Sequence, residues 1–330
     1  MVDTNQPPNA EASLVGDVTA TLIGLGLESF AFLGARGIAA IKAMTEPAVA
    51  TVRGLDSARG AVVVALPYDP RPRPVPTEPR RFGSIGAFAS SHRYATLARL
   101  LTSAGRSTAL TSGLPRASFR TAVNSRLPEK PLAVLAGLAF IGRSSLAITR
   151  RFGPSCVLGV LLLPFDPTGD ADASGLTGTE SAREPGGRCG DCKACVDACP
   201  TGAIQDPGSG RSGLDRSRCI QNWASESGSV PAEILDSWGN RVYGCDLCVR
   251  ACPYSNGAWM PDGRGTSAAI RADPLALPTE ARPGSWVDLD RILDAGDKDL
   301  SRWARGTALG FSWFTPALLR RNAGIAATPR

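Results

Sequence analysis

Apolar and polar positions follow one another along the chain in blocks that predict both strands and helices. The run at 61–66 (AVVVAL) is too short for a core helix and is rich in β-branched residues, so it predicts a buried strand. Two further strands are expected at 145–149 and 156–163, around a turn at Gly153. A chain that mixes such strands with helices is typical of an α+β fold.

Helical spacing of apolar residues marks several other segments. One helix is expected after Ser91 and ends at Gly105, because its apolar positions recur three and four residues apart at Tyr94, Leu97, Ala98 and Leu101. A second helix is expected at 129–136, where Gly137 stops it. A helical pattern at 289–302 and an apolar-basic segment at 303–327 follow near the end of the chain.

Stretches rich in proline, glycine and serine divide these segments. The segment 69–79 carries five prolines and predicts an exposed loop. We expect a disordered tail at 1–12, an α/β domain at 13–166, a linker at 167–188, a cysteine-rich domain at 189–256 and a C-terminal segment at 257–330 that packs on the core.

Composition narrows the class of protein only a little. The chain has 330 residues with 36 glycines and 26 prolines, and 20% of the residues are charged, which argues against wholesale disorder. The net charge of +6 permits an anionic partner such as RNA without requiring one. Charged residues interrupt the apolar stretch 14–41, so no membrane span is expected there, and the polar N-terminus does not resemble a secretory signal. We therefore expect a cytoplasmic protein.

Eight of the nine cysteines crowd between residues 189 and 252. They form C-x2-C-x2-C-x3-C-P from Cys189, a partial C-x2-C-x3-C-P from Cys245, and the isolated Cys219. The first spacing is that of bacterial iron–sulfur ferredoxins, in which the fourth cysteine ligates the other cluster. The count therefore suits two [4Fe-4S] clusters, one held by Cys189, Cys192, Cys195 and Cys252 and the other by Cys199, Cys219, Cys245 and Cys248.

Two other uses of cysteine fit less well. Structural zinc also uses C-x2-C pairs, but it has no need of a third cysteine followed by x3-C-P. Disulfides suit small secreted scaffolds rather than a chain of this length. The ninth cysteine, Cys156, lies in an apolar run and is expected to be a buried core thiol.

Five segments resemble the epoxyqueuosine reductases of queuosine-tRNA biosynthesis, which are distantly related to reductive dehalogenases. The resemblance covers roughly residues 60 to 327, and Cys219 stands where that family keeps the fourth ligand of its second cluster. It is carried by KPLAVLAGLAFIGRSSLAI (130–148), CGDCKACVDACPTGAI (189–204), RCIQNWASE (218–226), GNRVYGCDLCVRACPYS (239–255) and GTALGFSWFTPALLRRNAGIA (306–326).

The resemblance implies a fold, cofactors and partners. It implies a nitroreductase-like α/β domain that binds base-off cobalamin beside a two-cluster ferredoxin domain. Electrons from a donor such as a ferredoxin or flavodoxin would pass through the clusters to the cofactor and reduce an epoxide in tRNA. We expect no membrane partner and a monomer. The family's glycine-rich segment maps to cofactor contacts at Gly137, Gly142, Arg143, Ser144 and Ser145.

One departure concerns the catalytic acid. The family places an aspartate upstream of this segment as the presumed proton donor, and here that position is Asn124, with no aspartate between Asp69 and Asp166. An amide can bond a substrate but cannot donate a proton as an acid does. Glu129 and Tyr94 are conceivable substitutes, although Glu129 is expected to cap its helix or face solvent, and Tyr94 to pack in the core.

Three functions remain open. The chain is an epoxyqueuosine reductase with a different proton donor, a paralogue that reduces another substrate, or a two-cluster protein that carries electrons to a partner enzyme. The absence of the aspartate favours the paralogue. The electron carrier leaves about 150 N-terminal residues without a role, more than holding two clusters requires.

Overall fold

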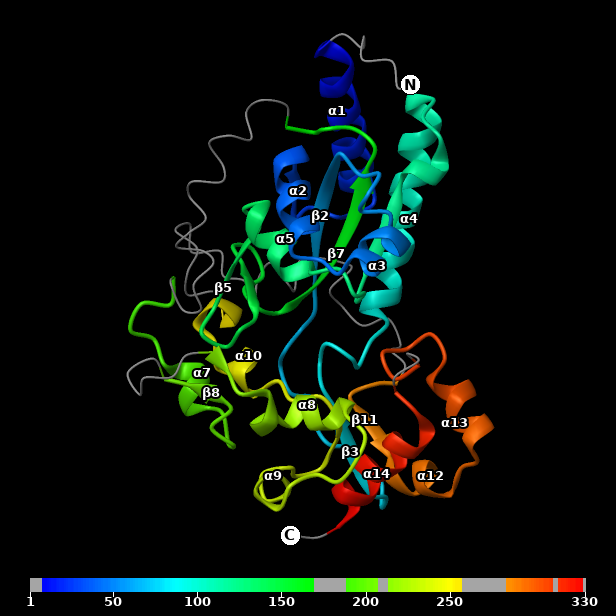
Figure 1. Cartoon of the computed structure of the whole chain (residues 1–330). Coiled ribbons are helices and arrows are strands. Elements are labelled where there is room, and N and C mark those ends of the chain that lie inside the picture. The colour runs from blue at the N-terminus through cyan, green and yellow to red at the C-terminus, as the bar shows by residue number, and fades with distance from the viewer. Residues whose placement is uncertain (1–7, 169–187, 207–212, 257–282, 311–313, 329–330) are drawn as a thin grey trace.

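The computed structural model describes residues 8–168, 188–206, 213–256, 283–310 and 314–328 (Figure 1). The first half of the chain contains α1 (Pro8–Gly24), β1 (Phe30–Leu33), α2 (Ala35–Ala43), α3 (Pro47–Arg53), β2 (Gly60–Pro67), β3 (Phe82–Ile85), α4 (Arg93–Ser112), β4 (Arg120–Val123), α5 (Glu129–Leu135), β5 (Ala139–Ile141), β6 (Ala147–Thr149) and β7 (Cys156–Leu163). The second half contains α7 (Ala194–Asp197), β8 (Ile204–Gln205), β9 (Gly213–Leu214), α8 (Ile220–Ser225), α9 (Ala232–Leu235), β10 (Arg241–Tyr243), α10 (Leu247–Ala251), β11 (Trp286–Asp288), α12 (Leu289–Asp294), α13 (Asp297–Ala304) and α14 (Pro316–Ala327).

A four-stranded sheet in the order β1-β2-β7-β4 forms the centre of the first half, and all its pairs are antiparallel. Its two central strands, β2 and β7, are the strands expected at 61–66 and 156–163, and Val63 lies opposite Val160. Every residue of β2 is buried. The uninterrupted apolar run therefore indicated correctly a strand that is covered on both faces.

Helices cover both faces of this sheet (Figure 1). On one face α1 and α4 pack against alternate residues of β2 and β7, among them Val62, Val64 and Leu161. On the other face α2, α3 and α5 pack against the intervening residues, such as Val63 and Val160. Because successive strand residues point to opposite faces, a run with no polar position supplies two cores at once.

Helix α4 is longer than its sequence predicts. Gly105 was expected to end it, but the helix continues to Ser112 and ends before Gly113, whose φ is +69°. A Cβ at Gly105 would lie 3.1 Å from both Leu161 Cδ1 and Phe119 Cβ. Gly105 therefore allows α4 to approach the sheet closely and is not a helix stop.

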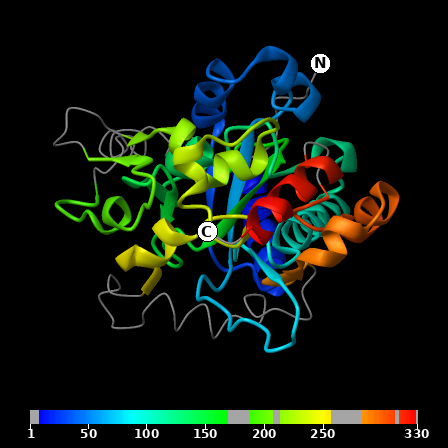
Figure 2. The ribbon, with the colours of Figure 1, turned by 90° about the horizontal axis from the view of Figure 1, so that it is seen from below.

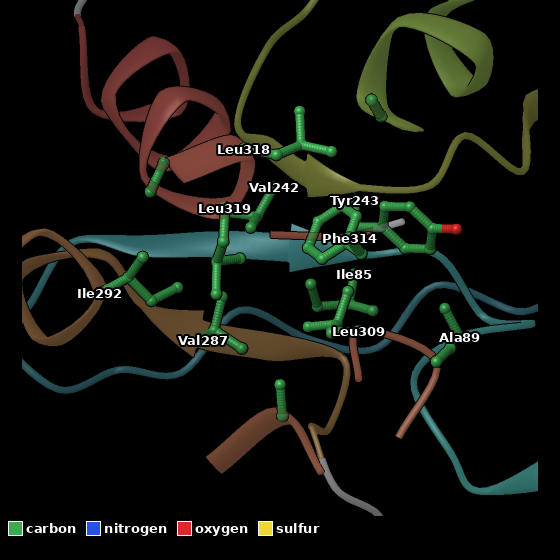
Figure 3. Close-up of a cluster of buried hydrophobic side chains, with 14 of the residues drawn as sticks. Ile85, Ala89, Val242, Tyr243, Val287, Ile292, Leu309, Phe314, Leu318 and Leu319 are labelled. Atoms are coloured by element: carbon green, nitrogen blue, oxygen red, sulfur yellow. The ribbon is translucent and has the colours of Figure 1, made fainter. Parts of the chain in front are cut away.

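A second sheet joins three distant parts of the chain. Its order is β10-β3-β11, with β3 in the centre. Figure 3 shows Ile85 of β3, Val242 and Tyr243 of β10 and Val287 of β11 packed with Leu318 and Leu319 of α14. The segment 257–330, expected to pack on the core, contributes β11 and α14 to this sheet and its core, while β3 and β10 come from the two expected domains. The boundary between those two domains therefore does not separate the fold at this sheet.

Three further expectations meet the structure near the ends of the chain. Residues 8–12 belong to α1 and are not a disordered tail, while 1–7 and most of the expected linker lie outside the described residues. The pattern at 289–302 is two helices, α12 and α13, that break at Ala295 and Gly296. Within the described part of the chain, no helix combines the length and the hydropathy needed to cross a membrane.

The cysteine-bearing segment lies to one side of the lower half of the molecule. Figure 1 and Figure 2 both place α7 (green) on the side opposite to α12 and α13 (orange). Helix α10 packs against α7, and the hairpin of β5 and β6 reaches the segment from the four-stranded sheet. Phe140 of this hairpin stacks edge-on against Tyr254, with ring centroids 5.4 Å apart.

Candidate functional site

Four of the eight cysteines gather around the loop before α7. Burial and the neighbouring thiols of Cys189 and Cys192 raise the pKa of Cys195. The pKa of Cys252, at the end of α10, is raised to about 11 by burial and by Cys189 and Cys195. Cys189 and Cys252 pack against the same buried cluster, which includes Phe140 and Ile148 of the hairpin, and α7, which carries Cys195, packs against α10. These cysteines therefore lie in one region of the structure, while their assignment to one cluster stays a prediction.

The other four cysteines line one cavity: Cys199, Cys219, Cys245 and Cys248. Burial and the nearby thiols of Cys245 and Cys219 raise the pKa of Cys248 well above its ordinary value. Although burial opposes it, hydrogen bonds with the backbone at Ile204 and with Thr201 lower the pKa of Cys199. Cys195 on α7 acts electrostatically on Cys248 on α10, and these two helices pack together, so the two sets of cysteines are neighbours.

A single metal ion needs a tighter arrangement than a cluster does. Across the described ranges, no three His, Cys, Asp or Glu side chains lie close enough to hold one metal ion. In a four-iron cluster each thiolate binds its own iron, so the four ligands surround a larger core.

Arg143 faces the cysteine loop. Its guanidinium donates hydrogen bonds to the carbonyl oxygen of Cys192 at 3.0 Å and to that of Gly190 at 2.7 Å. Its backbone N–H donates to Cys189 Sγ at 3.5 Å, and the residue is only 8% exposed. The side chain expected to contact cobalamin is therefore engaged with the backbone of the first cysteine run.

The other residues of the glycine-rich segment have separate positions. Gly137 ends α5 at φ +73°, a conformation in which glycine is favoured. A Cβ at Gly142 would lie 2.3 Å from Ile148 Cδ1, so this glycine allows the hairpin to pack. Ser145 has φ +60°, and its carbonyl accepts a hydrogen bond from Lys130 Nζ at 2.9 Å. Of the five residues expected to contact cobalamin, only Ser144 lines the cavity.

The cavity beside the second cysteine set has a volume of about 460 Å³. Its walls come from both halves of the chain and carry the rings of Tyr68, Phe88, Tyr94 and Tyr243. Two acceptors on its lining, Gln221 Oε1 and Asp246 Oδ1, are buried without a hydrogen-bond partner in the described structure. A buried acceptor of this kind is stabilised by a donor that a ligand brings.

The position of the missing aspartate lies on this cavity. Asn124 lines it with φ +48°, a left-handed conformation that asparagine tolerates better than most residues. Tyr94 also lines it, and burial raises the pKa of its hydroxyl. Cys156, expected as a core thiol, faces the same cavity, and burial raises its pKa to about 12.

Glu129 is half-buried at the start of α5, near the turn that carries Asn124, where it was expected to cap the helix or face solvent. Its Oε1 accepts a hydrogen bond from the backbone N–H of Ser125 at 2.9 Å. Burial raises its pKa to about 7, although this hydrogen bond opposes the rise. Glu129 therefore supports the turn that carries Asn124 and exchanges a proton near neutral pH.

Sequence reasoning missed most of the cavity wall. Tyr68, Tyr243, Gln221 and Asp246 were not singled out as site residues. Gln221 and Asp246 stand within two residues of Cys219 and Cys245, so proximity to the cysteines was an available signal. No comparable signal marks Tyr68, which follows β2 and reaches the cavity only through the fold.

Comparisons with known proteins point in the same direction as this geometry. The family described as "4Fe-4S double cluster binding domain" matches residues 188–255. The epoxyqueuosine reductase of Pseudomonas aeruginosa is 37% identical over 153 residues, which cover 44% of this chain and 37% of that protein. The match to this curated relative thus spans little more than a third of its length.

Solved structures share the fold over nearly the whole chain. The epoxyqueuosine reductase of Bacillus subtilis, captured with its catalytic loop swung out of the active site, has 23% identity and a TM-score of 0.68, covering 96% of this chain and 81% of that one. An epoxyqueuosine reductase with an epoxyqueuosine-modified tRNA stem loop has 22% identity and a TM-score of 0.66, with the same coverage. At these identities the likeness concerns the fold.

Proposed function

We propose that this chain, a relative of the epoxyqueuosine reductases, is an iron–sulfur reductase that binds cobalamin and reduces an epoxide or a related substrate. The observation that carries the proposal is that two sets of four cysteines lie beside each other, and that one of these sets lines a cavity with aromatic walls. A carrier that only passes electrons onward has no use for such a cavity, so the geometry favours the enzyme.

The cysteines would hold two [4Fe-4S] clusters with crosswise ligands. Cys189, Cys192, Cys195 and Cys252 would bind the first, and Cys199, Cys219, Cys245 and Cys248 the second. The second set borders the cavity, so its cluster would be the one that delivers electrons there. We expect a ferredoxin or flavodoxin in the cytoplasm as the donor, and a monomeric enzyme.

Cobalamin suits the chemistry of the cavity, and we extend the proposal to a nitroreductase-like first half that carries it. Gln221 Oε1 and Asp246 Oδ1 are unpartnered acceptors, and the corrin's side-chain amides are donors. Ser144 and the four aromatic rings would complete the contacts, while Arg143 holds the cysteine loop. Cobalamin supplies a cobalt centre that accepts electrons one at a time and provides two to a substrate.

Proton delivery would fall to residues other than an aspartate. Asn124 would bond and orient the substrate through its amide. Tyr94 carries a buried hydroxyl on the cavity, and Glu129 holds a proton at its carboxyl for part of the time at neutral pH. Since an acid at the reacting centre typically contributes 10²–10⁴ in rate, the exchange of aspartate for asparagine favours a paralogue with another substrate. Epoxyqueuosine in tRNA is the reference substrate.

A cofactor inventory of anaerobically purified protein tests the proposal. We expect about eight irons and eight sulfides per chain, together with a corrinoid absorbance after reconstitution with cobalamin. Four irons, or zinc in place of iron, would overturn the cluster assignment, and persistent absence of corrinoid would overturn the reductase. Turnover of epoxyqueuosine-tRNA by the loaded enzyme then separates the family reaction from that of a paralogue.

A further inference from the structure

A second hollow lies on the other side of the cavity wall. It has a volume of about 210 Å³ and shares Tyr68, Cys245 and Asp246 with the cavity. Of the described residues that line it, five are arginines and two are aspartates. The arginines are Arg71, Arg73, Arg93, Arg241 and Arg250, and the aspartates are Asp69 and Asp246. We call this space the arginine hollow.

Some of this charge is already engaged within the protein. The guanidinium of Arg71 donates two hydrogen bonds through Nε to Asp69, at 2.8 and 3.0 Å, and the Asp69 side chain is only 4% exposed. Arg241 donates to the carbonyl of Ser237 at 3.1 Å and to that of Trp238. The positive charge in the hollow therefore exceeds what its two carboxylates offset, even with Arg71 fully paired.

Arg73 is the arginine best placed for a ligand. It reaches Asp69 only at 3.4 Å, a long contact, and its side chain is 40% exposed. Trp286, which also lines the hollow, donates from Nε1 to the Arg73 carbonyl at 3.3 Å. The backbone of Arg73 is thus joined to β11 by a hydrogen bond, while its side chain lines the hollow and remains accessible to solvent.

We propose that the arginine hollow binds the phosphate of a phosphodiester. Arginine presents a planar fork of donors that matches phosphate oxygens, and a concave site with excess positive charge favours that anion. Two ligands carry a phosphodiester that fits this description. One is the nucleotide arm of a cobalamin whose ring occupies the adjoining cavity, and the other is the backbone of an RNA substrate. The first source rests on the proposed function, and the second does not require cobalamin.

Binding measurements on the full anaerobic chain separate these sources. The variants are Arg73→Gln, the charge-retaining Arg73→Lys, and the control Arg80→Gln. Arg80 is on the same connection between β2 and β3, has a more exposed side chain, and pairs with Glu78 and Asp288 outside the hollow. The probes are cobalamin, cobinamide, which lacks the nucleotide arm and its phosphodiester, and an RNA stem-loop titrated at several salt concentrations.

Arg73→Gln is expected to weaken the binding of one of the two phosphodiester probes about tenfold, because it removes one charged hydrogen bond. If the source is cobalamin, cobinamide binding stays unchanged. If the source is RNA, the slope of log K against log salt falls by about 0.7 to 0.9. Arg73→Lys retains part of the affinity, and Arg80→Gln binds like the wild type.

Three results would overturn the inference. In the first, Arg73→Gln binds every probe as tightly as the wild type does. In the second, Arg80→Gln loses as much affinity for the phosphodiester probe as Arg73→Gln does. In the third, the wild-type chain binds neither cobalamin nor RNA. The iron and sulfide content, which none of these variants should change, reports separately on the clusters of the proposed function.

Discussion

Replacing Arg143 by alanine should weaken retention of the first cluster more than binding of cobalamin. The guanidinium joins the hairpin of β5 and β6 to the cysteine loop through the carbonyls of Gly190 and Cys192. Without it, the loop that carries Cys189 and Cys192 loses the two hydrogen bonds that this side chain makes from the hairpin. The perturbation is local, because the thiols themselves stay in place.

The size of the effect follows from exposure. Hydrogen bonds to charged groups contribute about 1.5–3 kcal/mol each, and the higher values apply where the abandoned partner stays buried. Gly190 and Cys192 are exposed, so water replaces the guanidinium at both carbonyls. We therefore expect a total loss of about 2 kcal/mol, which corresponds to roughly a 30-fold weaker hold on the cluster. Arg143→Lys should weaken the hold on the cluster less than Arg143→Ala does but more than no substitution, because an ammonium group cannot bridge both carbonyls as the planar guanidinium does.

Iron release measures this directly. Anaerobic protein is challenged with an iron chelator, and the visible absorbance and iron per chain are followed over time. Arg143→Ala should lose about half of its iron, that of one cluster, much faster than the wild type. Arg150→Ala, at an exposed position seven residues on, is the matched control. Equal iron retention by Arg143→Ala and the wild type, or a loss confined to cobalamin affinity, would refute the tether.

Three further predictions concern single residues. The folded pKa of Glu129 is about 7 and lies above its unfolded value, so the folded state keeps the proton to a higher pH than the unfolded state does. The free energy of unfolding should therefore fall by about 3 kcal/mol as the pH rises from about 4.5 to 7, and Glu129→Gln should remove this slope in urea titrations across that range. Gly153→Ala should lower stability by about 2–3 kcal/mol in the same assay, because φ is +58° and a Cβ would lie 2.6 Å from the Tyr254 backbone, whereas Gly16→Ala, where no atom lies within 4 Å of a Cβ, should not lower it. Asn124→Asp should raise epoxyqueuosine-tRNA turnover at least tenfold in a single-turnover assay, and an unchanged rate would count against Asn124 as the position of the missing acid.

Local signals in the sequence predicted the parts of the fold that local chemistry determines. The apolar runs of β2 and β7 indicated strands because no polar residue interrupts them, and Gly137 ends α5 where the helical pattern stops. The short spacings of the runs 189–199 and 245–252 likewise predict which cysteines lie close together within each run, whereas the contacts between the runs and with Cys219 depend on the fold. Ligand assignment to the clusters stays a prediction.

Features that depend on distant partners could not be predicted in the same way. Strands β3, β10 and β11 have three or four residues each and pair across more than 150 positions, so no window of sequence contains their signal. Gly105 resembles a helix stop until the packing of Leu161 against it is known. The burial of Glu129 and the direction of the Arg143 side chain also arise only from the assembled fold.

The small sheet explains how the second cysteine set is held against the cavity. Just after β10, Gly244 has φ +96°, and a Cβ there would lie 2.6 Å from Gly86 Cα. The next residues are Cys245 and Asp246, and the Asp246 carboxylate accepts a hydrogen bond from the backbone N–H of Ala87. The first cysteine of the second run is therefore positioned by the end of β3, about 160 residues earlier in the chain.

The far end of the cysteine segment has its own attachment to the first half. The Ser155 hydroxyl donates a hydrogen bond at 3.0 Å to the hydroxyl oxygen of Ser255, three residues after Cys252, and both side chains are buried. Two anchors, one before Cys245 and one after Cys252, hold α10 between them. The position of α10 and its cysteines beside the cavity therefore depends on the contacts of Gly86 and Ser155, residues that carry no redox chemistry themselves. The spacing of the cysteines alone cannot determine that position.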